Sequence, residues 1–230
     1  MLKVKPAEDY LPEEGHYLRG NDYSPAAVVV ILTYDYDKIP KEIEDLVRLG
    51  VESGAALSGT LQTENIGIEK VICNIIANPN IRYIVLCGPE SKGHLTGEAL
   101  MCLLKNGIDE KKKIIGTEAP TPYLFNLPKE YIDRFRKQIV TIVNLLYADN
   151  ETVREAIKCC YQEKPTRFKE YILYDIGAFP EPPISGKLTW RVTHPEREPK
   201  SEEERKQKEK LEKMMQMIKE RVERKRNDKI

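Results

Sequence analysis

The chain has 230 residues, of which 40% are hydrophobic and 32% charged, a composition that provides one good core with a small appendage. Its formal net charge is zero, which excludes binding to nucleic acid or to an anionic membrane through the field of the whole molecule. The longest purely apolar run, residues 26–32, is far too short to span a bilayer, and the first residues lack the apolar core of a secretory signal.

Five cysteines occur in the chain, and no two of them are spaced as a CxxC pair. Cys73, Cys87 and Cys102 lie in apolar segments, so we expect them to be reduced core residues. Reduced thiols are typical of a reducing compartment, and we therefore expect a cytoplasmic protein.

The first predicted elements are a strand, a helix and a loop. Residues 26–33 form a nearly continuous β-branched run, which is typical of a strand buried on both faces in a parallel sheet. Residues 39–49 carry apolar side chains at helical spacing, and Gly50 follows as a stop signal. Residues 53–67 are rich in Gly, Ser and Thr and lack bulky side chains, which predicts a loop.

A second helix, a second strand and a third helix are predicted next. Isoleucines between residues 68 and 76 give an apolar helical face, and Thr63 is the expected cap of that helix. Residues 81–87 form a second buried apolar run, which predicts a strand. Residues 96–106 predict a helix that ends at Gly107.

The following segment is predicted to hold a short strand, a loop and a long helix. Residues 113–116 predict the strand, and residues 117–123 predict a loop that two prolines stiffen. Asn126 and Pro128 are expected to open the helix. Its apolar face comprises Ile132, Phe135, Ile139, Ile142, Val143 and Leu146. A further helix is predicted for residues 149–162.

The alternation of strands and helices predicts an α/β fold with a mostly parallel sheet flanked by helices. We expect this domain to cover residues 1–180, followed by a proline-rich linker at 181–200 with an edge strand near 187–193. Residues 201–230 are almost all charged, with an apolar stripe of Leu211, Met215, Ile218 and Val222. The stripe predicts an amphipathic helical tail, which is either a solvated, frayed helix or a docking helix or short coiled coil.

Three segments rich in Gly, Ser and Thr are expected at one edge of the sheet. In an open parallel sheet, ligands bind outside the carboxyl ends of the strands. Residues 53–67, 88–97 and 116–123 follow predicted strands or face that edge, and their small side chains let backbone amides approach a large polar ligand. We therefore expect a binding site there.

His94 lies in the second of these segments, just before a predicted helix begins. The positive end of a helix disfavours the imidazolium form, and the neutral imidazole is the form that binds a metal. No second His, Cys or Asp stands at metal-ligand spacing nearby, which argues against a zinc site with four protein ligands. His94 is either a surface or capping histidine, or the one protein ligand of a metal held in a tetrapyrrole or corrin.

Two long strings resemble a known family. They are SGAALSGTLQTENIGIEKVICNIIANPNIRYIVLCGPESKGHLTG at residues 53–97 and IIGTEAPTPYLFNLPKEYIDRFRKQI at residues 114–139. Both are similar to the A subunit of tetrahydromethanopterin S-methyltransferase, which carries a corrinoid, and the likeness covers roughly residues 10–180. It implies a Rossmann-like domain that binds a cobamide, either cobalamin or 5-hydroxybenzimidazolyl cobamide.

The resemblance also implies the site residues. The family's histidine in the Gly-His-x-Thr-Gly string is the lower axial ligand of cobalt, so His94 is the expected catalytic and metal-binding residue. Cofactor contacts are expected from Ser58, Gly59, Thr60, Thr63, Glu64, Gly93, His94, Leu95, Thr96, Gly97, Gly116, Thr117, Ala119, Pro120, Thr121 and Pro122. Gly93 and Gly97 are expected to allow close approach of the corrin and Thr96 to bond its periphery, and turn and cap chemistry is the alternative.

The function that the resemblance implies is methyl transfer. The cobalt takes a methyl group from methyl-tetrahydromethanopterin and passes it to coenzyme M, and partner subunits supply the donor and acceptor sites. Binding or release of His94 is expected to report the methylation state to its loop. The alternatives are a corrinoid storage, delivery or sensing protein without catalysis, and a nucleotide-binding domain without a corrin.

Two departures from related proteins lead to further expectations. The family ordinarily ends in a membrane-spanning helix, whereas residues 201–230 are charged. We therefore expect a soluble paralogue or an anchor-less form that docks through its tail and reaches a membrane only through a complex. Many corrinoid proteins carry an aspartate two residues before the histidine to orient it, and Lys92 stands at that position here. Without a carboxylate, the cobalt–nitrogen bond is expected to be weak.

Overall fold

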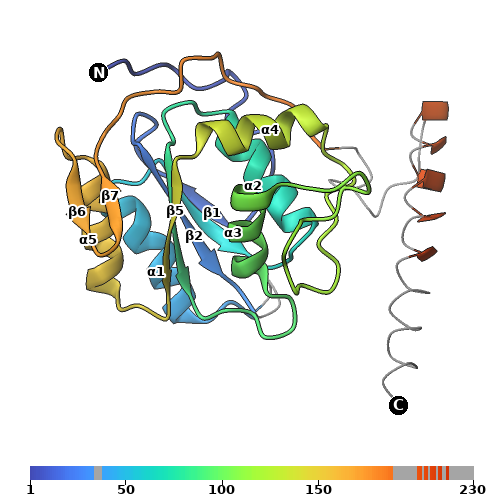
Figure 1. The fold of residues 1–230 in the computed structure, drawn as a ribbon, viewed down its shortest axis with the longest axis horizontal. Helices are drawn as coiled ribbons and strands as arrows, with labels where there is room; N and C mark the ends of the chain where they lie inside the picture. The colour runs from blue at the N-terminus through green and yellow to red at the C-terminus, as the bar shows by residue number, and fades with distance from the viewer. Residues whose placement is uncertain are drawn as a thin grey trace. The chain divides into compact units, whose positions relative to one another are not determined.

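Five strands form one sheet in the order β1-β3-β2-β4-β5 (Figure 1). β1 runs antiparallel to β3, and the other three neighbouring pairs are parallel. The strands are β1 Tyr17–Arg19, β2 Ala26–Ile31, β3 Leu57–Leu61, β4 Tyr83–Gly88 and β5 Thr141–Leu146. The predicted α/β fold with a mostly parallel sheet is therefore confirmed.

The computed structural model describes residues 1–33 and 38–188. In the C-terminal segment it describes residues 201–203, 205–206, 208–210, 212–213 and 216–217. The chain divides into two units, Met1–Lys187 and Leu188–Ile230, and the α/β domain is the first of them.

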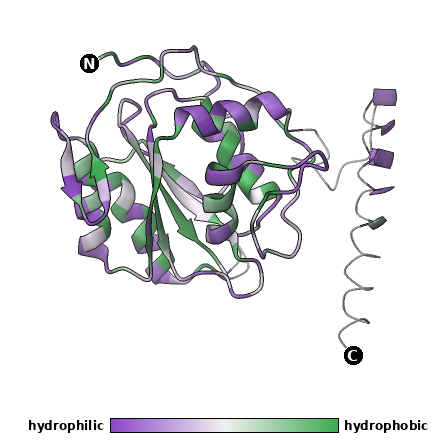
Figure 2. Ribbon diagram, in the orientation of Figure 1, coloured by the Kyte–Doolittle hydropathy of each residue, from purple (hydrophilic) through white to green (hydrophobic). Residues whose placement is uncertain are grey.

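Helices cover both faces of the sheet (Figure 1). α1 Lys41–Glu52 and α5 Asn150–Cys160 pack on one face, while α2 Ile66–Ile76, α3 Thr96–Asn106 and α4 Lys129–Gln138 lie on the other. Every residue of β2 and β4 is buried, as expected for parallel strands that are covered on both sides. Figure 2 shows the corresponding difference in hydropathy: the inner strands of the sheet are mainly hydrophobic, whereas α4, which covers them, is mainly hydrophilic.

Most of the predicted elements are confirmed. The strands expected near 26–33 and 81–87 are β2 and β4, and the helices expected near 39–49, 68–76, 96–106 and 149–162 are α1, α2, α3 and α5. Asn65 is the N-cap of α2, and its side chain accepts from the amide of Ile66. Thr63 assists, because its Oγ1 accepts from the amide of Gly67 at 2.9 Å.

The loop predicted for the whole of residues 53–67 is wrong, because the middle of this stretch forms β3 between β1 and β2. Gly59 lies so close to β1 that an added Cβ would stand 2.6 Å from the Cβ of Tyr17. Ser58 lies against α1, where a Cβ on Gly50 would stand 2.3 Å from its Oγ. Small residues here permit close packing, and α1 runs on through Gly50 instead of stopping there.

The long helix predicted from Pro128 onward is a helix followed by a strand. α4 ends at Gln138 and residues 141–146 form β5. The prediction is therefore wrong for Ile139, Ile142, Val143 and Leu146. The side chain of Gln138 is buried, and its amide donates to the carbonyls of Ile75, Asn78 and Ile81. A short apolar run fits a helix and a buried strand equally well, and pairing with β4 decides for the strand.

The strand predicted at residues 113–116 is also wrong. Lys113 and Ile114 make only isolated bridges, to Tyr123 and Ile108. These bridges join parts of the segment between α3 and α4, which otherwise forms an irregular loop.

A small hairpin that the sequence pattern did not predict follows α5. Its strands are β6 Thr166–Phe168 and β7 Tyr171–Leu173. The hydroxyl of Tyr171 accepts a hydrogen bond from the amide of Asn144 in β5 at 3.0 Å. The hairpin thus satisfies one outward-facing amide of the edge strand, which limits pairing with other chains.

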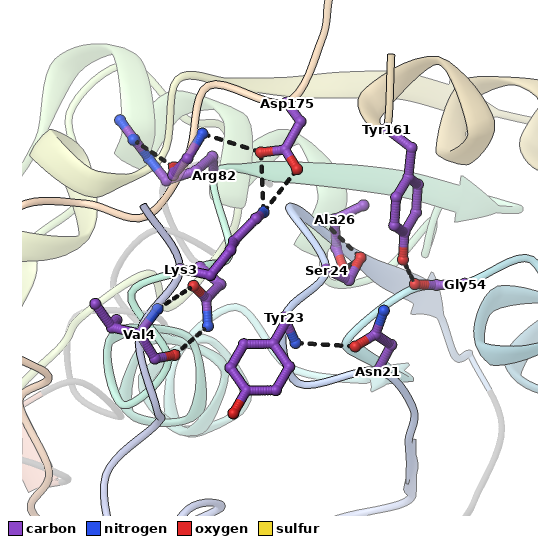
Figure 3. A network of polar contacts seen from close by, with 12 residues as sticks. Lys3, Val4, Asn21, Tyr23, Ser24, Ala26, Gly54, Arg82, Tyr161 and Asp175 are labelled. Atoms are coloured by element: carbon purple, nitrogen blue, oxygen red, sulfur yellow. Dashed lines mark hydrogen bonds and ion pairs between the residues drawn. The ribbon is translucent and has the colours of Figure 1, made fainter. Parts of the chain in front are cut away.

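The N-terminal segment is fastened to the amino ends of the strands, opposite the edge where ligands are expected (Figure 3). Lys3 forms an ion pair with Asp175 at 2.7 Å. The buried side chain of Asn80 accepts from the amide of Val4 at 3.1 Å, and it donates to the carbonyls of Val4 at 2.7 Å and Asp22 at 3.0 Å. These contacts join residues far apart in the chain at the base of the sheet.

Asn80→Ala is expected to lower the free energy of unfolding by about 2–3 kcal/mol, because it leaves several backbone groups without partners in a largely buried place. Urea denaturation followed by circular dichroism measures the change. Lys3→Ala is the comparison, since it removes a partly exposed ion pair that contributes about 1 kcal/mol or less. Equal losses in the two variants would contradict the prediction.

All five cysteines are free. Cys73 and Cys87 are buried as predicted, whereas Cys102 is only partly buried on α3, which corrects its assignment to the core. Cys160 is buried as well, and Cys159 is partly exposed. Burial raises the pKa of the Cys87 thiol to about 12, so this thiol stays protonated at neutral pH.

Iodoacetamide at mildly alkaline pH is expected to alkylate Cys102 and Cys159 first, because the thiolate is the reactive form and needs access. Cys73, Cys87 and Cys160 are expected to react only after unfolding, since burial raises the pKa of each thiol. Peptide mass spectrometry over time measures the order, and early labelling of Cys87 would contradict it.

In the second unit, the described residues between 202 and 217 are helical. The apolar stripe at Leu211, Met215, Ile218 and Val222 lies outside the described residues, as does most of the edge strand expected near 187–193. Within the parts of the chain that the structure describes, no helix has both the length and the apolar character needed to cross a membrane.

Candidate functional site

His94 lies at the carboxyl edge of the sheet, in the loop between β4 and α3. β4 ends at Gly88, which has a φ of +85°, and the chain then forms a turn in which the carbonyl of Ser91 accepts from the amides of His94 and Leu95 at 3.2 and 2.7 Å. The side chain of His94 is 52% exposed. A half-exposed imidazole on a short turn beside a helix start is open to a ligand from solution.

The carboxylate of Glu64 holds the imidazole from the protein side. Its Oε2 lies 2.8 Å from Nδ1 of His94, and the Glu64 side chain is only 1% exposed. A carboxylate accepts hydrogen bonds and cannot donate them, so Nδ1 carries the proton in this contact. In the neutral imidazole, the other ring nitrogen, Nε2, is then left with a lone pair that can bind a metal.

Thr121 holds Glu64 in turn. Both its backbone amide and its hydroxyl donate to Oε1 of Glu64, at 3.0 and 2.7 Å. The side-chain amide of Asn65 contacts the hydroxyl and the carbonyl of Thr121 at 3.3 and 3.4 Å. The three segments after β3, after β4 and after α3 therefore meet at one buried carboxylate.

The expectation that the imidazole lacks an orienting carboxylate is wrong. Lys92 does stand at the sequence position of the aspartate, but Glu64 supplies the carboxylate from a different segment, 30 residues away in the chain. A carboxylate that bonds the ring nitrogen not used for the metal, here Nδ1, fixes the ring and raises the basicity of the other nitrogen, Nε2. The physical reason given for a weak metal–nitrogen bond therefore does not hold for this protein.

Glu98, in the first turn of α3, makes a second set of contacts to the segment that follows α3. Its Oε2 accepts from the hydroxyl of Thr117 at 2.5 Å, and both its oxygens lie 3.2 Å from the amide nitrogen of Glu118. Thr117 also accepts from the amide of Ala119 at 3.1 Å. Residues 117–121 are thus held at one end by Glu98 and at the other by Glu64.

A second buried carboxylate supports the chain just beyond this segment. Glu69 on α2 is fully buried and accepts from the amide and the side chain of Asn126, both at 2.8 Å. Burial raises the pKa of Glu69, and the hydrogen bonds from Asn126 oppose that rise. None of the described hydrogen bonds of the Glu69 side chain goes to His94, Glu64 or Thr121, and this carboxylate positions the chain that follows Thr121.

Several predicted site residues have no described hydrogen bond to His94 or Glu64. Ser58 and Gly59 pack inside the sheet, against α1 and β1 respectively. The hydroxyl of Thr60 contacts the carbonyl of His16 at 3.4 Å, beside β1. Gly116 lies beside the second half of α3, where its carbonyl accepts from the thiol of Cys102.

The glycines around His94 have different surroundings. An added Cβ on Gly93 would meet nothing within 4 Å, so the space beside it is open. An added Cβ on Gly97 would stand 2.7 Å from Oε2 of Glu90, so only a glycine at this position leaves room for the Glu90 carboxylate. Leu95 has a φ of +49°, and Thr96 is fully buried with no hydrogen-bond partner for its hydroxyl among the described residues.

The prolines of the 116–123 segment differ in exposure. Pro120 is exposed, whereas Pro122 and the neighbouring Ala119 are buried. The carbonyl of Pro122 accepts from the amide of Ile114. Thr121, which bonds Glu64, is only half-buried and follows the exposed Pro120.

Glu90, Asn65 and Glu98 are polar residues of this region that the sequence pattern did not single out. The available signal was local, since Leu95 precedes a helix but has no side chain able to cap it, and acidic residues stand on both sides. An acidic residue near an uncapped helix start is a reasonable candidate for the missing cap.

The donor set at this edge limits what can bind. No group of three or more His, Cys, Asp and Glu side chains suited to a metal ion occurs in the described ranges 1–33 and 38–188 or in the described tail residues. One neutral imidazole offers one nitrogen. A metal bound here needs its other ligands from the group that carries it, as in a macrocycle with its own ring nitrogens.

Comparison with known proteins identifies the family of the chain. A family model for the A subunit of tetrahydromethanopterin S-methyltransferase matches residues 3–177. The chain is 41% identical over 170 residues to the A 1 subunit of that enzyme from Methanothermobacter marburgensis, a match that covers 73% of this chain and 66% of that relative.

Two further relatives have the same description. The chain is 38% identical over 186 residues to the A 2 subunit from Methanothermobacter thermautotrophicus, which covers 80% of this chain and 90% of the relative. It is 44% identical over 180 residues to the A subunit from Methanosphaera stadtmanae, which covers 78% of this chain and 64% of the relative. The chain therefore belongs to the family of the tetrahydromethanopterin S-methyltransferase A subunit.

Proposed function

We propose that this protein binds a cobamide through His94 and serves as the methyl carrier of a methyltransferase. The observation that carries the proposal is the contact between Glu64 and Nδ1 of His94 at 2.8 Å. It leaves Nε2 as a neutral donor at the carboxyl edge of the sheet, which is where an open α/β fold binds its ligands.

The residues of the site fit such a group. A cobamide would bring the ring nitrogens that hold its metal, so a single protein nitrogen would be enough to bind it, and one imidazole is what this edge offers. Gly93 leaves open space beside the ligand. Glu64 holds the Nδ1 proton and Thr121 holds Glu64, so the ring is oriented before the cofactor arrives. When bound, the cobalt supplies the methyl-accepting and methyl-donating chemistry.

The methyl donor and acceptor follow from the family. The relatives are named for tetrahydromethanopterin, and we propose methyl-tetrahydromethanopterin as donor and coenzyme M as acceptor. Partner subunits supply the sites for both. We propose a cytoplasmic location, with membrane association through such a complex.

A turnover experiment separates this function from storage, delivery or sensing. The protein is loaded with methylcobalamin and mixed with coenzyme M, with and without the purified partner subunits. Loss of the methylcobalamin absorption and formation of methyl-coenzyme M that depend on the partners would support the carrier function. Tight binding with no transfer under any of these conditions would favour storage or sensing, and absence of cobalamin binding would overturn the proposal.

A further inference from the structure

The carboxylate of Glu90 closes the base of the loop that carries His94. Its Oε1 accepts from the amide of Ser91 at 2.8 Å and from that of Gly97 at 3.1 Å, and its Oε2 accepts from the amide of Glu98 at 2.8 Å. Ser91 opens the turn, and Gly97 and Glu98 begin α3. One side chain therefore joins the two ends of the segment whose tip is His94.

The local sequence explains why this side chain is needed. The residue at the N-cap of α3 is Leu95, which has left-handed backbone angles and makes no capping hydrogen bond through its side chain. The first amides of a helix have no partner within the helix. Glu90 supplies the missing acceptor from five residues earlier, and its negative charge is favourable at the positive end of the helix.

Gly97 makes the contact possible. A Cβ at this position would stand 2.7 Å from Oε2 of Glu90, closer than real Cβ atoms come to a neighbouring atom. Gly93 has no such neighbour within 4 Å. The two glycines near His94 therefore have different roles: Gly93 leaves open space, and Gly97 leaves room for the carboxylate of Glu90.

We propose that Glu90 is a positioning residue that keeps His94 in contact with Glu64. The turn between Ser91 and Leu95 is short, and Glu90 fixes both its entry and its exit. Without this carboxylate the tip can move away from Glu64, and the imidazole no longer has a fixed ring orientation or a single tautomer. The effect on cobalt rests on the proposed function, whereas the effect on the imidazole does not.

The alternative is that Glu90 only stabilises the end of a helix. Asp149 provides a control, because its carboxylate also accepts from a first-turn amide, that of Thr152 in α5 at 2.8 Å, although Asp149 is itself the N-cap residue. Removing either cap is expected to lower stability by a similar amount. Only removal of Glu90 is expected to change the state of His94.

The test uses nitrogen-15 NMR of the histidine rings in the protein without cofactor. Wild type and Asp149→Ala are expected to show the His94 tautomer with the proton on Nδ1. Glu90→Ala is expected to show averaged tautomers. Glu90→Gln keeps a carbonyl oxygen for Ser91 and Gly97 but not for Glu98, so it is expected to lie between the two, and it is informative even if Glu90→Ala folds poorly.

A second measurement follows cobalamin binding. Glu90→Ala is expected to raise the dissociation constant about tenfold, at the lower end of the effect of residues that orient a metal ligand, and Asp149→Ala is expected to leave it unchanged. Unaltered His94 tautomers in both Glu90 variants would overturn the inference. If the wild type binds no cobalamin, the proposed function fails while the NMR comparison still tests Glu90.

Discussion

His94→Ala is expected to remove the protein nitrogen from cobalt and to weaken cobalamin binding by about 100-fold or more. Loss of a residue that merely orients a metal ligand costs about 10- to 100-fold, and loss of the ligand itself is expected to cost at least as much. The rest of the fold is expected to be unaffected, because the His94 side chain is half exposed and packs in no core.

Electron-spin resonance of the cobalt(II) form measures the ligand directly. Cobalamin carries a nitrogen base of its own, so the protein is labelled with nitrogen-15 histidine to identify the ligand by its hyperfine coupling. His16→Ala is the matched control, since His16 lies next to β1, where its carbonyl contacts the hydroxyl of Thr60, and it has no described hydrogen bond to Glu64. A histidine coupling that persists in His94→Ala, or disappears in His16→Ala, would overturn the assignment.

Glu64→Gln is expected to weaken cobalamin binding nearly as much as His94→Ala, although it only replaces one oxygen with an amide nitrogen. Oε1 of Glu64 accepts two hydrogen bonds from Thr121, so the carbonyl oxygen of the new glutamine is expected to take that side. Its NH2 group then faces Nδ1 of His94. An NH2 group donates, so Nδ1 is forced to accept and the ring proton moves to Nε2. The nitrogen that should bind cobalt then carries a proton.

We expect Glu64→Gln to weaken cobalamin binding about 100-fold, at the upper end for such positioning residues. Nitrogen-15 NMR of the protein without cofactor should show the His94 proton on Nε2. Glu69→Gln is the control, because Glu69 is also a buried carboxylate with an amide partner but does not contact His94. A His94 proton that stays on Nδ1 in Glu64→Gln would contradict the argument.

The alternation of strands and helices was sufficient to predict the α/β fold, but not every strand. Residues 57–61 contain Ser58 and Gly59, and small residues in a sequence indicate a loop as readily as a tightly packed strand. The distinction depends on Tyr17 and Gly50, which approach from β1 and α1. Likewise β5 has an apolar spacing that also fits a helix, and only its pairing with β4 decides.

The candidate site was also predictable only in part, because local sequence features indicate a ligand loop but not the contacts between distant segments. The glycines around His94 and its place before a helix indicated a ligand loop, and Glu64 and Thr121 could be named as members of neighbouring segments. Their hydrogen bonds to one another could not be predicted, because they join residues 30 and 57 positions apart. Lys92 was misleading for that reason, since the orienting carboxylate need not be close in sequence to the histidine.

Under the proposed function, the convergence of three distant segments on Glu64 couples cobamide binding to the folding of the domain. Those segments meet only when the whole domain has folded, so a corrinoid captured there binds the native chain and not the unfolded one. Such a ligand adds to the stability of the native state by an amount that grows with the logarithm of its concentration. Under the proposed function, protein without cofactor is therefore expected to be less stable, and to be degraded faster, than protein that has bound it.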